Sequence, residues 1–242
     1  MKSSIYAVTG GMMTAMERLN ITANNLANVH TNGYKADIPF EQTIKFLTEG
    51  PFPGKDQPVL SGTTNNMAQG MITHTNRKLD LALEGPGFFA IQGANNKEVY
   101  TRNGAFNLNS KKELITMDGS FVLDKFDKKI TIAGEKMQIT PSGDIIVDDN
   151  YYTSLKVIQA PDRNDIEKQG NTNFVFKDPN KKPTLLAIPQ MSVGALEKAN
   201  INMLDGITEL VSGQRTFEMQ KSAADLLFNI MKKVITEIPK PI

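Results

Sequence analysis

The chain has 242 residues, which is long enough to form at least one substantial hydrophobic core. Its 27 Lys and Arg nearly balance its 26 Asp and Glu, and this argues against a general nucleic-acid binder, because such proteins carry a basic excess. The sequence has no cysteine, so disulfides, thiolate catalysis and cysteine-based zinc sites are excluded.

Residues 1–32 predict a helix with one apolar stripe. The stripe repeats every seven positions, with further apolar residues between, in the set Ile5, Met12, Met16, Leu19, Ala23 and Leu26. Alternating steps of four and three are typical of helices that pack as coiled coils. We expect the helix to end near residues 29–30, because Gly33 is suited to the left-handed conformation that follows many helices. Polar and charged residues interrupt this segment, so no cleaved secretory signal is expected.

Residues 33–78 follow neither a helical nor a strand pattern. They contain several prolines and glycines, among them the run at 50–54, and a polar run at 61–66. We predict an extended, partly ordered connector here.

Residues 79–198 predict a central all-β domain. Short apolar or alternating segments recur with turn signals such as Asn103-Gly104 and Asp118-Gly119 between them. The predicted strands are 79–83, 88–91, 99–101, 105–108, 113–116, 121–123, 128–132, 136–139, 144–147, 154–159, 173–176 and 185–188. Residues 161–173 and 177–183 are predicted surface loops. Many short strands with regular turn signals indicate an antiparallel barrel or a sandwich-like domain.

Residues 199–242 predict a second long helix. Its stripe again follows steps of four and three, through Met203, Ile207, Leu210, Gln214, Phe217, Lys221, Ala224, Phe228, Met231 and Ile235. A lone helix with a narrow apolar stripe is marginal in water, so both terminal helices need partners. These partners are the other helix, further copies of the chain, or both. The fold class is therefore α+β, with the two terminal helices forming a coiled-coil-like layer beside a central β domain.

No catalytic, cofactor or metal site is expected. His30 and His74 have no set of ligand residues around them in the sequence, and Asp148-Asp149 is a turn signal rather than a metal loop. The chain also lacks a phosphate loop, a dinucleotide fingerprint and a nucleophile elbow. We therefore expect a protein that is not an enzyme.

The segment I-T-A-N-N-L-A-N-V-H-T-N-G-Y-K at 21–35 resembles the N-terminal signature of bacterial flagellar rod and hook proteins. That signature has the form A-N-N-L-A-N, two variable residues, T, one variable residue, G, an aromatic residue and K. Three further stretches resemble the same family, namely 79–91 with 100–106, 134–147, and Q-R-T-F-E-M-Q at 214–220. The resemblance covers nearly the whole chain, although Gly10-Gly11 and His30 depart from the usual residues.

This resemblance implies a structural subunit of the flagellar rod. It implies export through the flagellar type III apparatus without a cleaved signal, a final place in the periplasmic part of the basal body, and partners among copies of the chain and the other rod proteins. The length and the F-E-M-Q helix are most similar to proximal rod members, and the distal rod members are the alternative. A less favoured hypothesis is a secreted β-domain binding module with a helical dimerisation stalk. Only one aromatic pair, Tyr151-Tyr152, lies in a predicted loop, and the chain has no tryptophan, which argues against a sugar-binding platform.

The asparagines of the first helix are candidates for contacts between subunits. Asn20, Asn24 and Asn28 are spaced at four residues on one helix face, and Asn25 lies beside them. A solvated face is the alternative, but amides can pair across an interface without burying a charge. Gln214 and Lys221 lie at the edge of the second stripe or fix its register. The predicted assembly residues are Ile5, Met12, Met16, Leu19, Asn20, Asn24, Asn25, Leu26, Asn28, Met203, Ile207, Leu210, Gln214, Arg215, Phe217, Glu218, Ala224, Phe228 and Met231.

Overall fold

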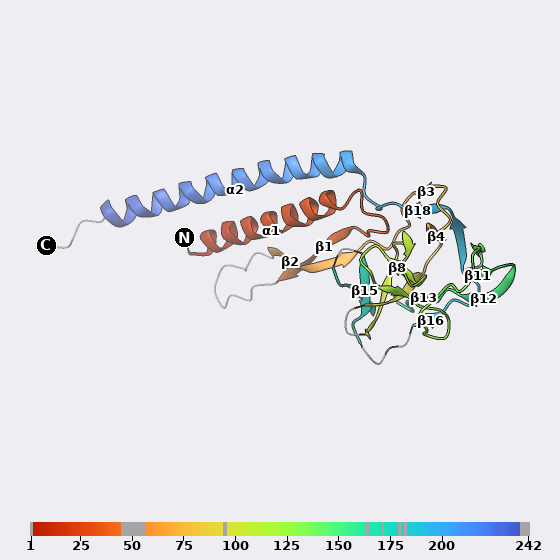
Figure 1. Ribbon diagram of the computed structural model, residues 1–242. Coiled ribbons are helices and arrows are strands. Elements are labelled where there is room, and N and C mark those ends of the chain that lie inside the picture. The colour runs from red at the N-terminus through yellow and green to blue at the C-terminus, as the bar shows by residue number, and fades with distance from the viewer. Residues whose placement is uncertain are drawn as a thin grey trace. The chain divides into compact units, whose positions relative to one another are not determined.

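The computed structural model describes residues 2–44, 57–93, 96–162, 165–170, 172–178, 181 and 183–237 (Figure 1). The side chains of residues 2–7, 41–44, 57–61 and 234–237 lie outside this description, as does the Pro-Gly run at 50–54. The chain divides into two compact units. We name them the helical unit, residues 1–27, 37–64 and 202–242, and the β unit, residues 28–36 and 65–201. Helices at both ends and a mostly β middle confirm the α+β class.

The helical unit contains two helices and one small sheet. Helix α1 is Lys2–Ala27, helix α2 is Met203–Glu237, and strands β1 (Asp37–Ile44) and β2 (Gln57–Asn65) pair with each other. Helix α2 begins where Asn202 caps it, because the Asn202 side chain accepts a 3.1 Å hydrogen bond from the Leu204 backbone amide. The predicted connector at 33–78 thus contains β1 and β2, and also β3 (Ile72–His74) of the β unit.

The β unit is built around one large sheet in the order β14-β15-β6-β5-β9-β8-β7, which β13 and β16 join. Strand β5 is its centre, because it pairs antiparallel with β6, β9 and β13. A three-stranded sheet β10-β11-β12 and the pairs β17-β4 and β18-β3 complete the unit. The bounds are β4 Leu81–Glu84, β5 Phe88–Gln92, β6 Glu98–Thr101, β7 Phe106–Leu108, β8 Leu114–Thr116, β9 Phe121–Val122, β10 Met137–Ile139, β11 Asp144–Val147, β12 Asn150–Ser154, β13 Val157–Gln159, β14 Ile166–Lys168, β15 Asn173–Phe176, β16 Thr184–Leu185, β17 Gln190–Val193 and β18 Ala195–Glu197.

Both faces of β5 are buried. Phe89 and Ile91 belong to one hydrophobic cluster and Phe88 and Ala90 to another, as the two-residue period of a strand requires. Phe89 meets Phe106 edge to face, with ring centroids 5.2 Å apart. The described strands form this open sheet and smaller sheets, and they do not close into the barrel that was one of our predicted alternatives.

Several local predictions need correction. Tyr151-Tyr152 lies in strand β12 rather than in a loop, because Asp148 and Asp149, both with positive φ, form the two-residue turn before it. Asn103-Gly104 is not a hairpin turn, since β6 and β7 are not neighbours in the sheet. The predicted strand at 128–132 is reduced to isolated bridges, whereas β14, β17 and β18 lie where we predicted none.

Candidate assembly surface

Helices α1 and α2 pack side by side and antiparallel (Figure 1). Three points along their contact establish the direction. A Cβ atom added at Gly206 would lie 3.6 Å from Leu26, one at Gly213 would lie 2.9 Å from Leu19, and one at Gly11 would lie 3.5 Å from Gln220. As the chain advances along α1, its neighbours in α2 come from earlier in the sequence.

The contact between the helices uses small residues that the predicted stripes did not include. On α1, Ala15 and Thr22 are buried, whereas the predicted neighbours Met16 and Ala23 are exposed. On α2, Gly206 and Gly213 lie against α1, one position before Ile207 and Gln214. Glycine and alanine permit the close approach of two helices, so the seven-residue repeat is retained but its second position shifts by one residue.

This shift leaves large apolar side chains on the outside of the helical unit. On α1, Met13 is 69% exposed and Met16 is 55% exposed. On α2, the exposed apolar residues are Met203, Leu204, Ile207, Val211, Met219, Leu226, Phe228 and Ile230. Exposed apolar surface on this scale is typical of interaction surfaces, so the outward faces of α1 and α2 are candidates for contacts with partners.

The asparagines predicted in the first helix divide into two groups. The Asn25 side chain donates a 2.8 Å hydrogen bond to the Asp37 carbonyl and accepts one of 2.9 Å from the Asp37 amide, so it fastens β1 to α1. Asn28 is buried, and its side chain accepts a hydrogen bond from the Thr31 hydroxyl. Asn20 and Asn24 are exposed. Asn25 and Asn28 are therefore both used within the chain.

The remaining predicted assembly residues also fall into groups. Half-buried positions are Met12, Leu19, Leu26, Leu210, Phe217, Ala224 and Met231. Exposed positions are Met203, Ile207, Gln214, Arg215, Glu218 and Phe228. The side chain of Ile5 lies outside the described residues. Within α2, the Gln214 amide lies 3.4 Å from the Glu218 carboxylate.

A buried ionic cluster in the β unit holds together the segment after α1 and the segment before α2. The Glu197 carboxylate accepts a 2.7 Å hydrogen bond from the Lys35 ammonium and a 2.5 Å hydrogen bond from the Arg102 guanidinium. All three side chains are at most 3% exposed. We name these three residues the anchor. Burial lowers the pKa of Lys35, and the charge of Glu197 opposes part of that shift.

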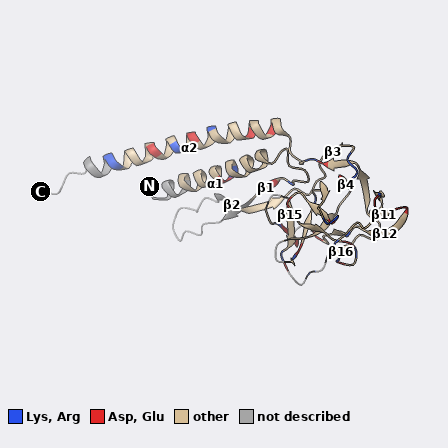
Figure 2. Ribbon diagram, in the orientation of Figure 1, with Lys and Arg blue, Asp and Glu red and all other residues tan. Residues whose placement is uncertain are grey.

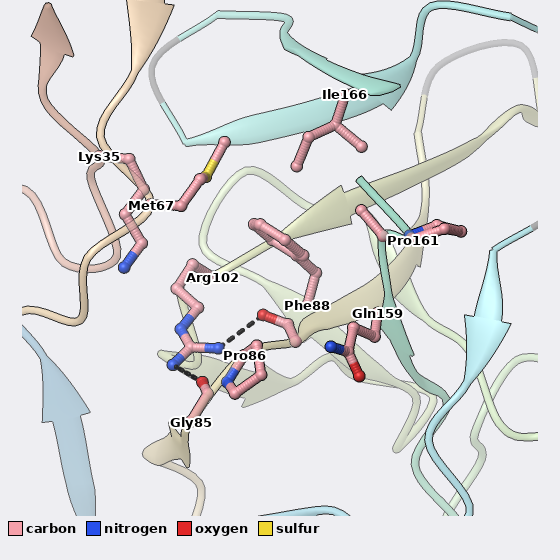
Figure 3. A pocket seen from close by; sticks show the side chains of 11 residues that line it. Lys35, Met67, Gly85, Pro86, Phe88, Arg102, Gln159, Pro161 and Ile166 are labelled. Carbon is pink, nitrogen blue, oxygen red and sulfur yellow. Dashed lines mark hydrogen bonds between the residues drawn. The ribbon is translucent and has the colours of Figure 1, made fainter. Parts of the chain in front are cut away.

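Backbone groups complete the anchor. The Arg102 guanidinium also donates to the carbonyls of Leu83, Gly85 and Gly87, two of which Figure 3 shows as dashed lines. The Glu197 carbonyl accepts a 2.8 Å hydrogen bond from the Gly33 amide. The anchor should be sensitive to substitution, because the loss of one partner leaves the other buried charges desolvated and unpaired.

The glycine and the aromatic residue of the signature both occupy closely packed positions. Gly33 has φ +71°, and a Cβ atom there would lie 2.4 Å from the Asn103 backbone nitrogen. Tyr34 is 1% exposed, and the Lys168 ammonium lies 4.1 Å from its ring centre. The Asn200 side chain accepts a hydrogen bond from the Ala36 amide and donates to the carbonyls of Asn66 and Ala68.

A pocket of about 240 Å³ lies beside the anchor, lined by Met67, Phe88, Pro161, Ile166 and their neighbours (Figure 3). Lys35 and Arg102 border it, but both already bond to Glu197 and to carbonyl groups. The pocket therefore offers no uncommitted cation to a ligand. The described residues contain no cluster of His, Cys, Asp or Glu able to hold a metal ion. None of their helices is long and apolar enough to span a bilayer.

Sequence reasoning missed Glu197. It is a single carboxylate in a predicted β region, and its partners are 162 and 95 residues away in the chain. The sequence did place Lys35 and Arg102 inside motifs, and two cations in a buried setting call for an acidic partner. No sequence signal distinguished Glu197 from the other acidic residues.

Two family models match the chain, and together they define its class. The model described as flagella basal body rod protein matches residues 5–35, which include most of α1 and the signature. The model described as flagellar hook protein FlgE/F/G D1 domain matches residues 82–153, within the β unit. The chain thus falls in the class of flagellar rod and hook proteins, as its resemblance predicted.

Individual relatives narrow the class. The chain is 30% identical to the flagellar basal-body rod protein FlgF of Caulobacter vibrioides, with 99% of each chain covered. It is 28% identical to FlgF of Escherichia coli, covering 91% of this chain and 92% of that one. It is 26% identical to the rod protein FlgG of Agrobacterium fabrum, covering 96% and 99%. The chain belongs to the flagellar basal-body rod protein family.

Proposed function

We propose that this chain is a structural subunit of the bacterial flagellar rod that polymerises through the outward faces of α1 and α2. It has no enzymatic role in this proposal. Its proposed place is the proximal rod, as the resemblance of its length and its F-E-M-Q helix implies, and the distal rod is the alternative. The rod is part of the shaft that drives motility.

The observation that carries the proposal is the exposed apolar surface of the helices. Leu204 is 73% exposed and Met219 is 65% exposed on α2, and Met13 is 69% exposed on α1. An amphipathic helix in a complete fold turns such residues inward and charged residues outward. Burial of a large apolar side chain is worth about 1.5–3 kcal/mol, so contacts between subunits along both helices would supply substantial binding energy.

In this proposal the subunits associate head to tail. A contact between two different surfaces whose rotation does not close builds an open helical assembly rather than a ring. The helices pack in a coiled-coil-like layer, and the exposed Asn20 and Asn24 add amide contacts that fix the register of neighbouring subunits. Other rod proteins extend the same layer at each end of the stack.

The proposal includes a route and a location. The chain reaches the periplasmic part of the basal body through the flagellar type III export apparatus. This part of the proposal is supported by the family to which the chain belongs.

Substitution of the outward apolar residues tests the function. In a strain lacking the gene, we expect Met13→Glu and Leu204→Glu each to abolish motility while normal amounts of protein are made. Ile188→Glu is the matched control, because Ile188 is 78% exposed on the β unit. It should swim normally. Motility of the two helix variants equal to that of the unmodified protein would contradict polymerisation through these faces.

A further inference from the structure

Along one edge of α2, the side chains change from short polar ones to apolar ones. Positions 205, 208, 212, 216, 219, 223, 226 and 230 follow one another in steps of three and four, so they form a continuous row on the helix surface. The first half of the row carries Asp205, Thr208, Ser212 and Thr216. The second half carries Met219, Ala223, Leu226 and Ile230. Short polar side chains therefore give way to apolar ones, three of which are large.

The first half of this edge borders a groove between α1 and α2. The groove has a volume of about 580 Å³, and Ala15, Arg18, Leu19 and Thr22 of α1 form its other wall. The hydroxyls of Thr208 and Thr216 donate to backbone carbonyls within α2. These two side chains in the groove therefore already have a hydrogen-bond acceptor.

The second half of the edge is a ridge. Met219 is 65% exposed, Leu226 is 62% exposed and Ile230 is 47% exposed. Helix α2 is also longer than α1, with 35 residues against 26, so its end extends past the start of α1 (Figure 1). A ridge of large side chains and a groove of small ones are the two elements of helix packing.

We propose that the ridge of α2 in one copy of the chain seats in the groove between α1 and α2 of the next copy, with the two α2 helices parallel. Because ridge and groove lie on the same edge of one helix, a second copy that is turned by about half a turn around an axis parallel to α2, and displaced along that axis, brings them together. Ridge and groove are centred about 14 residues apart, so the displacement is roughly 21 Å at 1.5 Å per residue. Leu226 of one copy then faces Ser212 of the other.

The parallel direction rests on the proposed rod function. A parallel, displaced pair leaves one groove and one ridge unused, so the assembly continues, whereas an antiparallel pair would use both and close as a dimer. The parallel pair also brings Arg215, one turn before Met219, toward Asp205 at the acidic start of α2 (Figure 2). Arg18 lies on the opposite wall of that groove and Glu209 borders it.

Cysteine cross-linking tests both the contact and its direction, because the chain has no native cysteine. Two full-length proteins, Thr216→Cys and Ile230→Cys, are mixed and exposed to a mild oxidant, and the disulfide-linked heterodimer is measured. Positions 216 and 230 of one helix are roughly 21 Å apart, far beyond disulfide reach, so the product reports on contacts between copies. We expect at least a tenfold greater yield than for Ile188→Cys mixed with Ile230→Cys.

Other outcomes overturn the inference. Antiparallel packing would instead link Met219→Cys to itself and Thr208→Cys to Ile230→Cys. Background yields for every pair, from a protein that still sediments as polymers, would disprove the ridge-and-groove contact and leave the proposed function standing. Background yields without any self-association, at concentrations up to millimolar, would count against both.

Discussion

The helical unit and the β unit place their apolar side chains in opposite ways. In the β unit, Phe89, Phe106 and Phe174 are fully buried, and three of its buried charged side chains meet in the anchor. In the helical unit, Leu204 and Met219 are mostly exposed although the two helices already pack on each other. The β unit buries its large apolar side chains within itself, whereas the helical unit leaves part of its apolar surface exposed.

The difference separates two physical tasks. A buried core with satisfied polar groups gives one well-defined structure, because each alternative leaves a charge or an amide without a partner. An exposed apolar row gives affinity for a neighbour and contributes little to the isolated chain. The following substitutions test this contrast, and the first three each have a control in the same unit.

Removal of the anchor carboxylate should have the largest effect. Glu197→Ala leaves Lys35 and Arg102 buried without their acidic partner, so we expect a loss of about 3–5 kcal/mol in the free energy of unfolding. Urea denaturation followed by tyrosine fluorescence measures it, since four of the five tyrosines lie in the β unit. The exposed Glu167 provides the control, and Glu167→Ala should change stability by less than about 0.5 kcal/mol. Equal effects of the two variants would show that the anchor is not stabilising.

Gly33→Ala should be the next most damaging change. The left-handed conformation alone costs an alanine about 1–2 kcal/mol, and Gly119→Ala isolates that cost because a Cβ atom there meets nothing within 4 Å. At Gly33 the Cβ atom also collides with the backbone near Asn103. We expect Gly33→Ala to be less stable than Gly119→Ala by a further 1 kcal/mol, roughly, as measured by urea denaturation. Similar losses would mean that the neighbouring backbone moves freely.

Asn25→Ala tests the amide that the helical unit uses within the chain. It removes both hydrogen bonds to Asp37, so we expect the free energy of unfolding to fall by about 1–3 kcal/mol. Circular dichroism should show the loss of helix at a lower temperature. Asn20→Ala, at an exposed position, should leave this melting unchanged and weaken self-association instead. If Asn20→Ala lowers the melting temperature as much as Asn25→Ala does, the division of the asparagines into two groups is wrong.

The smallest effect concerns alkaline pH. Burial and the adjacent Glu98 charge raise the pKa of Tyr100 well above its ordinary value. The unfolded chain loses this proton near pH 10 while the folded chain keeps it, so the stabilising contribution is complete below pH 10 and decreases as the pH rises beyond it. Tyr100→Phe should show a shallower fall in stability between pH 9.5 and 11, measured by urea denaturation. An unchanged slope would exclude Tyr100 as its cause.

Much of this organisation follows from the sequence alone. Seven-residue periodicity determined that both ends are helices, because apolar spacing of three and four has no other regular solution. The turn residues located most strands of the β unit, and the signature at 21–35 identified the family. These features are local, so they can be recognised within short windows.

Only the tertiary structure decided which residues meet. Small residues at Gly206, Gly213 and Ala15 let the helices approach closely, and this moved the contact one position away from the predicted stripe. Glu197 acquired its role from Lys35 and Arg102, which are distant in sequence and close in space. Periodicity describes one helix at a time, whereas close packing and charge pairing depend on two segments together.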